Sequence, residues 1–168
     1  MKKIVLFLLM LFSLCTIQAQ NDSIKLKKFV VGDKFQNFAY KDVSGKTFTM
    51  KDFKGKYVYV DFWATWCEWC LKEIPYLEKL QNEMKGKNIV FLSLSVDEDT
   101  LGWKRMVKEE HMGGVQLLAG INFFMFKYYV PGYPHFILLD KKGRIINSNM
   151  TRPSNVETKQ TLLELKGI

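Results

Sequence analysis

Two cysteines separated by two residues carry the clearest chemical signal in the chain. Cys67 and Cys70 follow the almost wholly apolar run Tyr57–Trp63, which is typical of a buried strand, and they open a segment with helical periodicity. The first turn of a helix offers unpaired backbone N–H groups and the positive end of the helix dipole, and both stabilise a thiolate. Because the thiolate is the species that attacks a disulfide, the spacing predicts dithiol–disulfide exchange. Cys67 is the expected nucleophile and Cys70 the resolving thiol.

Two other uses of such a cysteine pair compete with this prediction. Half of a zinc site would need further ligands, and only His111 and His135 remain as good partners. A purely structural disulfide is the other alternative, but a bridge that closes so short a loop constrains the unfolded chain little. We therefore expect a redox pair, with no metal and no cofactor.

The start of the chain predicts export. Lys2 and Lys3 precede the apolar run Ile4–Leu14, and the small residue Ala19 lies where a signal peptide would be cut. Residues 1–19 are therefore the expected signal peptide, and the mature protein would be extracytoplasmic, in the periplasm. An uncleaved anchor or lipidation at Cys15 is the alternative, and only these would attach the protein to a membrane.

Composition indicates one globular domain. The chain has 168 residues, of which 48% are hydrophobic and 25% charged. Loss of residues 1–19 would remove Lys2 and Lys3 from a formal charge of +8, and the remaining basic residues are interspersed with acidic ones. The chain has no block of basic residues that would indicate nucleic-acid binding. We expect residues 20–34 to form a loosely ordered lead-in and residues 35–168 the folded domain.

The elements that must position the cysteines follow from periodicity and turn signals. Apolar residues at three- and four-residue spacing predict a helix from about residue 67 to 85, kinked at Pro75, with Leu71, Ile74, Leu77, Leu80 and Met84 buried. Further strands are predicted at 89–96, 115–118, 136–139 and 144–147, and an N-terminal hairpin at 38–41 and 46–50. Further helices are predicted at 99–110 and 155–165, the last burying Val156, Leu162, Leu163 and Leu165. This order predicts an α/β sandwich with a mixed sheet.

The motifs also resemble a known family. Val60–Cys70, with the sequence VDFWATWCEWC, closely resembles the active-site strand and turn of thioredoxins, and Leu71–Pro75 continues it like the extracytoplasmic TlpA/ResA-like branch. Val130–Asp140 resembles that family's second signature. The resemblance covers about residue 38 to the C-terminus. It implies a thioredoxin-like three-layer sandwich, a central mixed β-sheet flanked by helices, with the N-terminal β-hairpin as an extension.

The resemblance also implies roles for two acidic residues. Asp61 would be buried behind the cysteines, where burial raises its pKa and lets it take the proton of Cys70. Glu73 would tune the thiols and help proton transfer. The alternatives are a strand-end Asp61 that water reaches and an ordinary solvated Glu73.

Four further residues are candidates for substrate binding. Pro134 matches the family's cis-proline, which faces the cysteine pair, and Tyr133 would offer backbone groups to an extended substrate peptide. Trp66 is a further candidate contact. Trp69 stands where the family usually has proline, and is either a substrate contact or a packed helix residue. His135 stands where threonine is common and could tune the thiolate.

The predicted function is thiol–disulfide exchange with protein substrates. The family-typical substrates include apo-cytochromes c, and a membrane electron donor is expected. Because Glu68 beside Cys67 disfavours the thiolate, a reductant is favoured over a strong oxidant. The alternatives are a peroxiredoxin-like thiol peroxidase and a non-catalytic thioredoxin-fold binding module.

Overall fold

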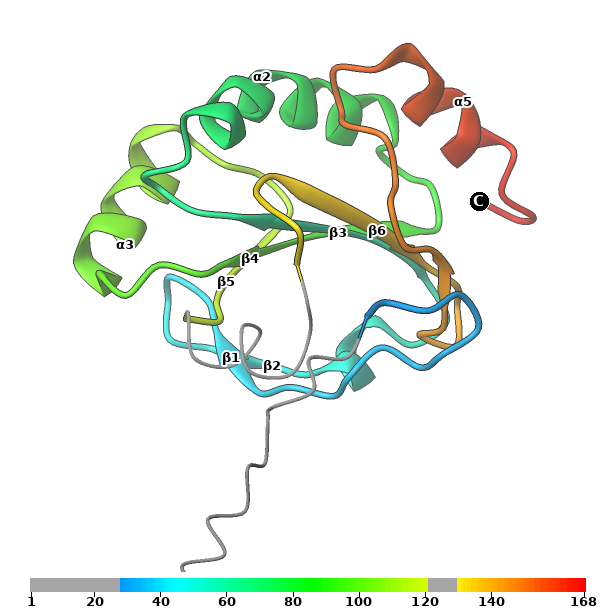
Figure 1. Cartoon of the computed structure of the whole chain (residues 1–168), viewed down its shortest axis with the longest axis horizontal. Helices are drawn as coiled ribbons and strands as arrows, with labels where there is room; N and C mark the ends of the chain where they lie inside the picture. The colour runs from blue at the N-terminus through cyan, green and yellow to red at the C-terminus, as the bar shows by residue number, and fades with distance from the viewer. Residues whose placement is uncertain (1–27, 121–129) are drawn as a thin grey trace, which may run out of the picture.

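The computed structural model of the chain describes residues 28–120 and 130–168 (Figure 1). The expected signal peptide, Cys15 and the first part of the expected lead-in lie outside the described residues. Within these two ranges, no helix is both long and apolar enough to cross a membrane.

Seven strands of the described chain form one mixed sheet. Its order is β2-β1-β5-β4-β3-β6-β7, and the interior strand β3 pairs with β4 in parallel and with β6 in antiparallel orientation. The strands are β1 (Tyr40–Lys41), β2 (Thr47–Phe48), β3 (Tyr57–Trp63), β4 (Ile89–Ser95), β5 (Val115–Leu118), β6 (His135–Leu139) and β7 (Ile145–Asn147). The predicted N-terminal hairpin is thus confirmed as β1 and β2, and it extends the sheet by pairing with β5.

Helices cover one face of this sheet. Helix α2 (Glu68–Glu83) and helix α5 (Val156–Leu163) lie along the same side of β3 and β6 (Figure 1), and pack there on Tyr59, Phe136 and Leu138. Helix α3 (Thr100–Glu109) buries Trp103 and Val107 near the start of α2. These contacts hold the beginning of α2 at the end of β3, where the chain carries both cysteines.

Aromatic side chains from the N-terminal part of the described chain cover the opposite face. Phe29, Phe35, Phe38 and Phe53 are buried there, the last in the short 3-10 helix η2 (Met50–Phe53). The ring of Phe29 stacks on Phe62 of β3 with centroids 5.5 Å apart. The packed core therefore begins before residue 35, which is the domain start expected from the sequence.

Helix α2 differs from its predicted burial in one informative way. Leu77, Leu80 and Met84 are buried as predicted, whereas Leu71 and Ile74 are only half-buried. The acidic Glu73 takes a buried position between them. Periodicity ranks residues by hydrophobicity and so cannot anticipate a buried carboxylate that has found polar partners.

Helix α5 differs more strongly. Leu162 is fully buried, but Val156 is 79% and Leu163 is 42% exposed, so their predicted burial was wrong. Val156 is the first residue of the helix, after the N-cap Asn155, and lies beyond the edge of the packed face. Thr158 is buried instead, because its hydroxyl donates to the Arg152 carbonyl at 2.6 Å and is thereby satisfied.

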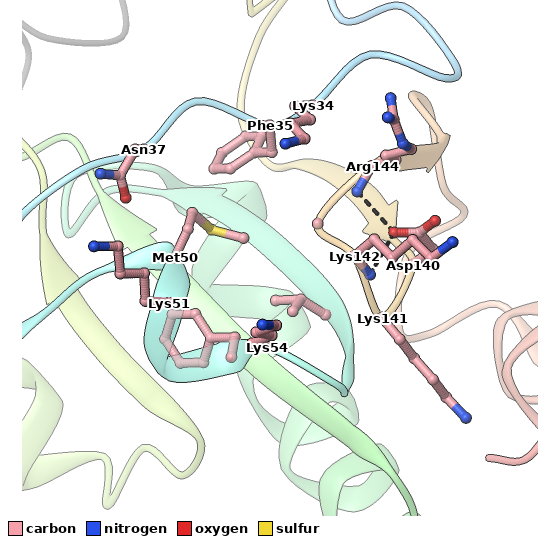
Figure 2. A pocket seen from close by; sticks show the side chains of 13 residues that line it. Lys34, Phe35, Asn37, Met50, Lys51, Lys54, Asp140, Lys141, Lys142 and Arg144 are labelled. Atoms are coloured by element: carbon pink, nitrogen blue, oxygen red, sulfur yellow. Dashed lines mark hydrogen bonds between the residues drawn. The ribbon is translucent and has the colours of Figure 1, made fainter.

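A basic cavity lies at the end of β3 remote from the cysteines (Figure 2). Its volume is about 520 Å³, and Val58 and Phe53 line it together with Lys51 and Lys54. The carboxylate of Asp140 accepts the backbone N–H groups of Lys142 and Arg144, each at 2.8 Å, and so closes the hairpin between β6 and β7. This cavity is separate from the cysteine site, which lies beyond the opposite end of the same strand.

Candidate active site

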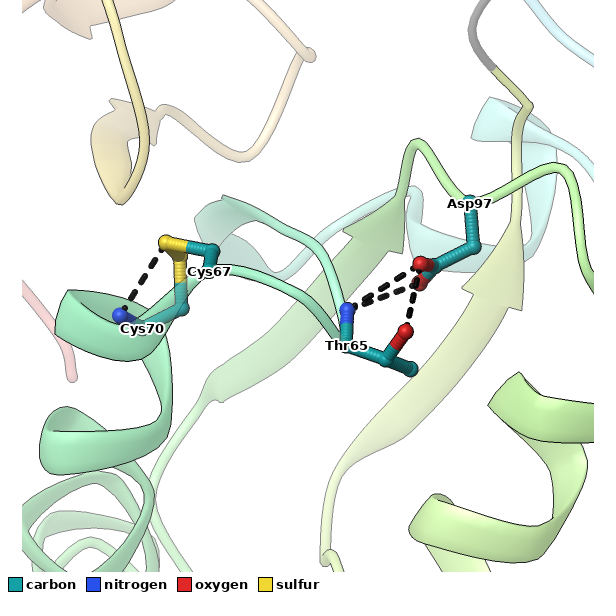
Figure 3. Close-up of a disulfide and its surroundings, with 4 residues drawn as sticks. All are labelled: Thr65, Cys67, Cys70 and Asp97. Atoms are coloured by element: carbon teal, nitrogen blue, oxygen red, sulfur yellow. Dashed lines mark hydrogen bonds between the residues drawn. A yellow bond between two sulfur atoms is a disulfide. The ribbon is translucent and has the colours of Figure 1, made fainter.

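The two cysteines form a disulfide at the first turn of α2 (Figure 3). Cys67 is the N-cap residue, and its sulfur lies 2.05 Å from that of Cys70. The backbone N–H of Cys70 donates to the Cys67 Sγ at 3.1 Å. The predicted placement at a helix N-terminus is therefore confirmed. A negative charge on Cys67 would meet this N–H group and the positive end of the helix dipole.

A buried carboxylate fixes the turn that presents Cys67. Asp97, just after β4, accepts the backbone N–H of Thr65 at 3.0 and 3.1 Å and the Thr65 hydroxyl at 2.7 Å (Figure 3). The hydroxyl of Ser95 donates to the same carboxylate at 2.6 Å. Sequence reasoning missed Asp97. The available signal was a polar residue directly after a buried parallel strand, because the carboxyl ends of β3 and β4 meet at one edge of the sheet.

Asp61 lies inside the protein beneath the first turns of α2. It lies two residues after Tyr59 on β3, so its side chain points to the same face of the sheet, the face that α2 covers, and it is buried as expected. The Ser93 hydroxyl donates to one carboxyl oxygen at 3.4 Å, and the other oxygen has no hydrogen-bond partner among the described residues. Burial raises the pKa of Asp61 to about 7; the Ser93 hydrogen bond opposes this rise, and the negative charge of Glu73 adds to it. The alternative of a solvated strand-end aspartate is wrong.

Glu73 is buried and joins α2 to a distant loop. Its carboxylate accepts the backbone N–H of Ser154 at 2.9 Å and the Ser154 hydroxyl at 2.8 Å. The alternative of a solvated glutamate is therefore wrong. No sequence pattern indicated Ser154, because 81 positions separate the two residues. The contact anchors the loop before α5 against the helix that carries Cys70.

Aromatic residues surround the disulfide at the surface. Trp66 is 63% exposed and contacts the half-buried Tyr133 edge to face, with ring centroids 5.9 Å apart. Trp69 is 59% exposed, so it is not a packed helix residue. The Tyr133–Pro134 peptide bond is cis, as the resemblance implied. A groove of about 630 Å³ begins at these two residues and extends along the loop that contains Arg152 and Ser154.

His135 does not contact the cysteines. It pairs in register with Phe62, so its ring points to the aromatic face of the sheet, and it stacks on Phe29 with centroids 5.9 Å apart. Burial lowers the pKa of His135. His135 therefore makes no direct contact through which it would tune the thiolate, the role expected from the sequence. Within residues 28–120 and 130–168, no three His, Cys, Asp or Glu side chains converge as a metal site would require.

Comparison with known families decides the classification. The family model described as Redoxin matches residues 30–163, a range that contains the strands and the helices of the site. The chain belongs to the Redoxin family. The matched range includes the cysteine pair, Asp61, Glu73 and the cis-proline loop.

The curated and solved relatives of this Redoxin-family chain include several thiol–disulfide oxidoreductases. The thiol-disulfide oxidoreductase ResA of Bacillus thuringiensis subsp. konkukian is 34% identical over 122 residues, which covers 73% of the chain and 70% of the relative. A candidate thiol-disulfide oxidoreductase of Bacteroides vulgatus, solved in solution, is 46% identical with a TM-score of 0.70, covering 78% of the chain and 89% of that structure. The thioredoxin domain of another Bacteroides vulgatus thiol-disulfide oxidoreductase is 32% identical with a TM-score of 0.72, covering 80% and 96%.

The Redoxin-family chain is thus a redox enzyme with a thioredoxin-like fold and a Cys67–Cys70 disulfide. Its predicted activity, thiol–disulfide oxidoreduction, is confirmed at this level. The chemistry that the site offers is a two-electron exchange at the Cys67–Cys70 disulfide, next to an exposed aromatic surface.

Proposed function

We propose that this oxidoreductase reduces disulfide bonds of protein substrates in an extracytoplasmic compartment. The observation that carries the proposal is the position of Cys67, whose sulfur accepts a backbone N–H at the N-cap of α2 beside the exposed Trp66 and Trp69. The helix terminus supports a thiolate, and the aromatic rim offers a surface on which a protein substrate can rest.

The proposed reaction proceeds through a mixed disulfide. The Cys67 thiolate attacks one sulfur of the substrate disulfide, a bond forms between them, and the other substrate sulfur leaves as a thiolate. The Cys70 thiol then loses its proton and attacks the Cys67 sulfur. The second substrate sulfur leaves, the Cys67–Cys70 disulfide forms, and two electrons have passed to the substrate. A dithiol donor must then reduce the protein again, and we expect a membrane-bound one.

Asp61 is the proposed acceptor of the Cys70 proton. Its side chain faces the buried side of α2, the side on which Cys70 and Glu73 also lie. A carboxyl with a pKa of about 7 exchanges protons readily near neutral pH. Glu73 would act on this step through its charge, which raises the pKa of Asp61, and by holding the adjacent loop.

The cis-proline loop is the proposed docking edge for substrate. Tyr133 and Pro134 precede β6 and border the groove, and the edge contact between Tyr133 and Trp66 keeps this border beside the cysteines. An extended substrate segment could pair with the backbone there as an added strand. Apo-cytochromes c remain the family-typical candidates for this segment.

The charges at the active site favour a reductant. Glu68 stands between the cysteines and pairs with Lys72 at 3.0 Å, so the dipeptide adds no free cation that would stabilise the Cys67 thiolate. Strong oxidants require such stabilisation of their reduced form. The N-terminal pattern of Lys2, Lys3 and an apolar run supports export.

A trapping experiment tests the proposal. The variant Cys70→Ser, in a Cys15→Ser background, should hold protein substrates as mixed disulfides on Cys67, visible as reducible higher-mass bands on gels. The matched control is Cys67→Ser in the same background, which should trap none. If only the control trapped partners, the assignment of nucleophile and resolving thiol would be reversed, and trapping by neither would refute protein disulfide exchange.

A further inference from the structure

Two cationic side chains lie close to the exposed ring of Trp69. Lys72 Nζ is 4.4 Å and Arg152 Cζ is 6.0 Å from its centroid, distances at which cations are attracted to an indole face. The two cations differ in their other partners. Lys72 is paired with Glu68 at 3.0 Å, whereas no acidic side chain of the described ranges lies within ion-pair distance of Arg152. Arg152 therefore keeps its charge available to a ligand.

The loop that carries Arg152 is held in place from both sides. The Ser154 N–H and hydroxyl both bind Glu73 of α2. The Arg152 carbonyl accepts the Thr158 hydroxyl at 2.6 Å and the Asn155 N–H at 3.0 Å. Because these bonds fix the backbone, the Arg152 side chain extends from a defined point next to Trp69.

Arg152 also lines the groove that begins at the cis-proline loop. Tyr133, Pro134 and Arg152 are among its lining residues, with Asn149 and Asn155 as further polar members. Of the described residues that line this groove, none is acidic, and Arg152 is the one Lys or Arg. A segment bound along the groove would thus pass from Tyr133, which packs against the cluster that contains both cysteines, to a positively charged point.

We propose that this groove selects extended substrate segments that carry an acidic residue beside the substrate cysteine, with the carboxylate bound by Arg152 next to Trp69. The guanidinium fork matches a carboxylate in two-point geometry, and the indole supports the adjoining apolar part of the segment. This inference rests on the proposed function and names its substrate class.

A pair of matched substrates tests this selectivity. Two disulfide-linked dimers of one short peptide differ only by Glu or Lys next to the cysteine, and each is mixed with the reduced protein in a Cys15→Ser background. The measured quantity is the ratio of the two second-order rate constants. A substitution that changes the reactivity of the Cys67 thiol affects both substrates alike, so such a change cancels in this ratio. The variants are Arg152→Gln and Arg152→Glu, and the control is Arg105→Gln on the exposed side of α3.

The unaltered protein and the Arg105→Gln control should both prefer the Glu peptide. Arg152→Gln should lower that preference by roughly threefold or more at low salt, the size of a surface ion pair, and Arg152→Glu should reverse it. High salt should reduce every preference, because exposed charges are screened. If both peptides are reduced and the ratio does not respond to Arg152, the selectivity proposal is wrong and the proposed function stands. If neither peptide is reduced, the proposed function itself fails.

Discussion

Asp61 holds a carboxyl group entirely inside the fold, and this has a consequence for stability. In the unfolded chain an aspartate titrates near pH 4, whereas burial raises the pKa of Asp61 in the folded protein to about 7. Between these values the folded state binds the extra proton, so stability falls as the pH rises and levels off above about 7. We expect Asp61→Asn to remove this loss, gaining at most about 4 kcal/mol over the original protein at pH 8 and little at pH 4. Urea unfolding at several pH values measures the difference.

Two comparisons decide whether Asp61 causes that dependence. Glu109→Gln changes an exposed carboxyl on α3 and should leave the pH dependence of unfolding unaltered. In the reduced enzyme, Asp61→Asn should also lengthen the lifetime of the mixed disulfide on Cys67 at pH 7, because Cys70 loses its proton acceptor. Parallel stability curves for Asp61→Asn and the original protein would show that the buried carboxyl does not titrate as described.

Some site residues could be predicted from the sequence and others could not. The cysteines were identified because their spacing is a local feature, whereas the role of Asp61 was implied by the family resemblance. The cis bond before Pro134 came from family resemblance alone, since local composition does not distinguish it from an ordinary trans bond. The partners of Glu73 and Thr65 were missed because Ser154 and Asp97 reach them only through the folded chain.

At the scale of elements, α5 shows how a short helix can mislead. Its eight residues make about two turns, so several apolar stripes fit its sequence equally well. In the structure Leu162 is buried with Tyr59, Leu77 and Leu80, whereas Leu163 is 42% exposed. By contrast, β3 has its predicted bounds, because a nearly continuous apolar run between turn signals leaves little choice, and β5 also has its predicted bounds.

Adjacent leucines of α5 therefore give a matched test of its orientation. We expect Leu162→Ala to lower the free energy of unfolding by about 2 to 4 kcal/mol, because it opens a cavity in the core. Leu163→Ala, with the same chemical change, should cost less than about 1 kcal/mol. Chemical denaturation of both variants measures the two losses. Equal losses would mean that α5 is rotated about its axis from the orientation described.

At the scale of the whole molecule, the sheet separates the cysteine site from the basic cavity. The carboxyl ends of β3 and β4 meet the start of α2, so the redox pair, Asp97 and the groove gather at one end of the sheet. The basic cavity that Val58 and Lys54 line lies beyond the other end of β3. A substrate bound at the cysteines thus leaves the basic end uncovered.

The direction of electron flow can be measured through the stability of the entire fold. Folding and oxidation form a thermodynamic cycle, so the fold stabilises the disulfide form of a reductant more than its dithiol form, whereas a strong oxidant shows the reverse. For the proposed reductant we expect a fall in Tm of roughly 5 °C on reduction, in a Cys15→Ser background. Thermal unfolding followed by circular dichroism, with and without dithiothreitol, measures the change.

The control for this measurement is Cys70→Ser, which cannot close the bridge and should unfold at one temperature under both conditions. A rise in Tm on reduction of the protein with both cysteines would mean that the fold favours the dithiol, as in an oxidant. That result would overturn the reductant role and leave the exchange chemistry intact. The sign of the change in Tm depends on which redox form the fold stabilises and does not depend on whether Cys67 reacts. The difference in stability between the disulfide and dithiol forms of the whole chain thus indicates the direction of a reaction that takes place at two sulfur atoms.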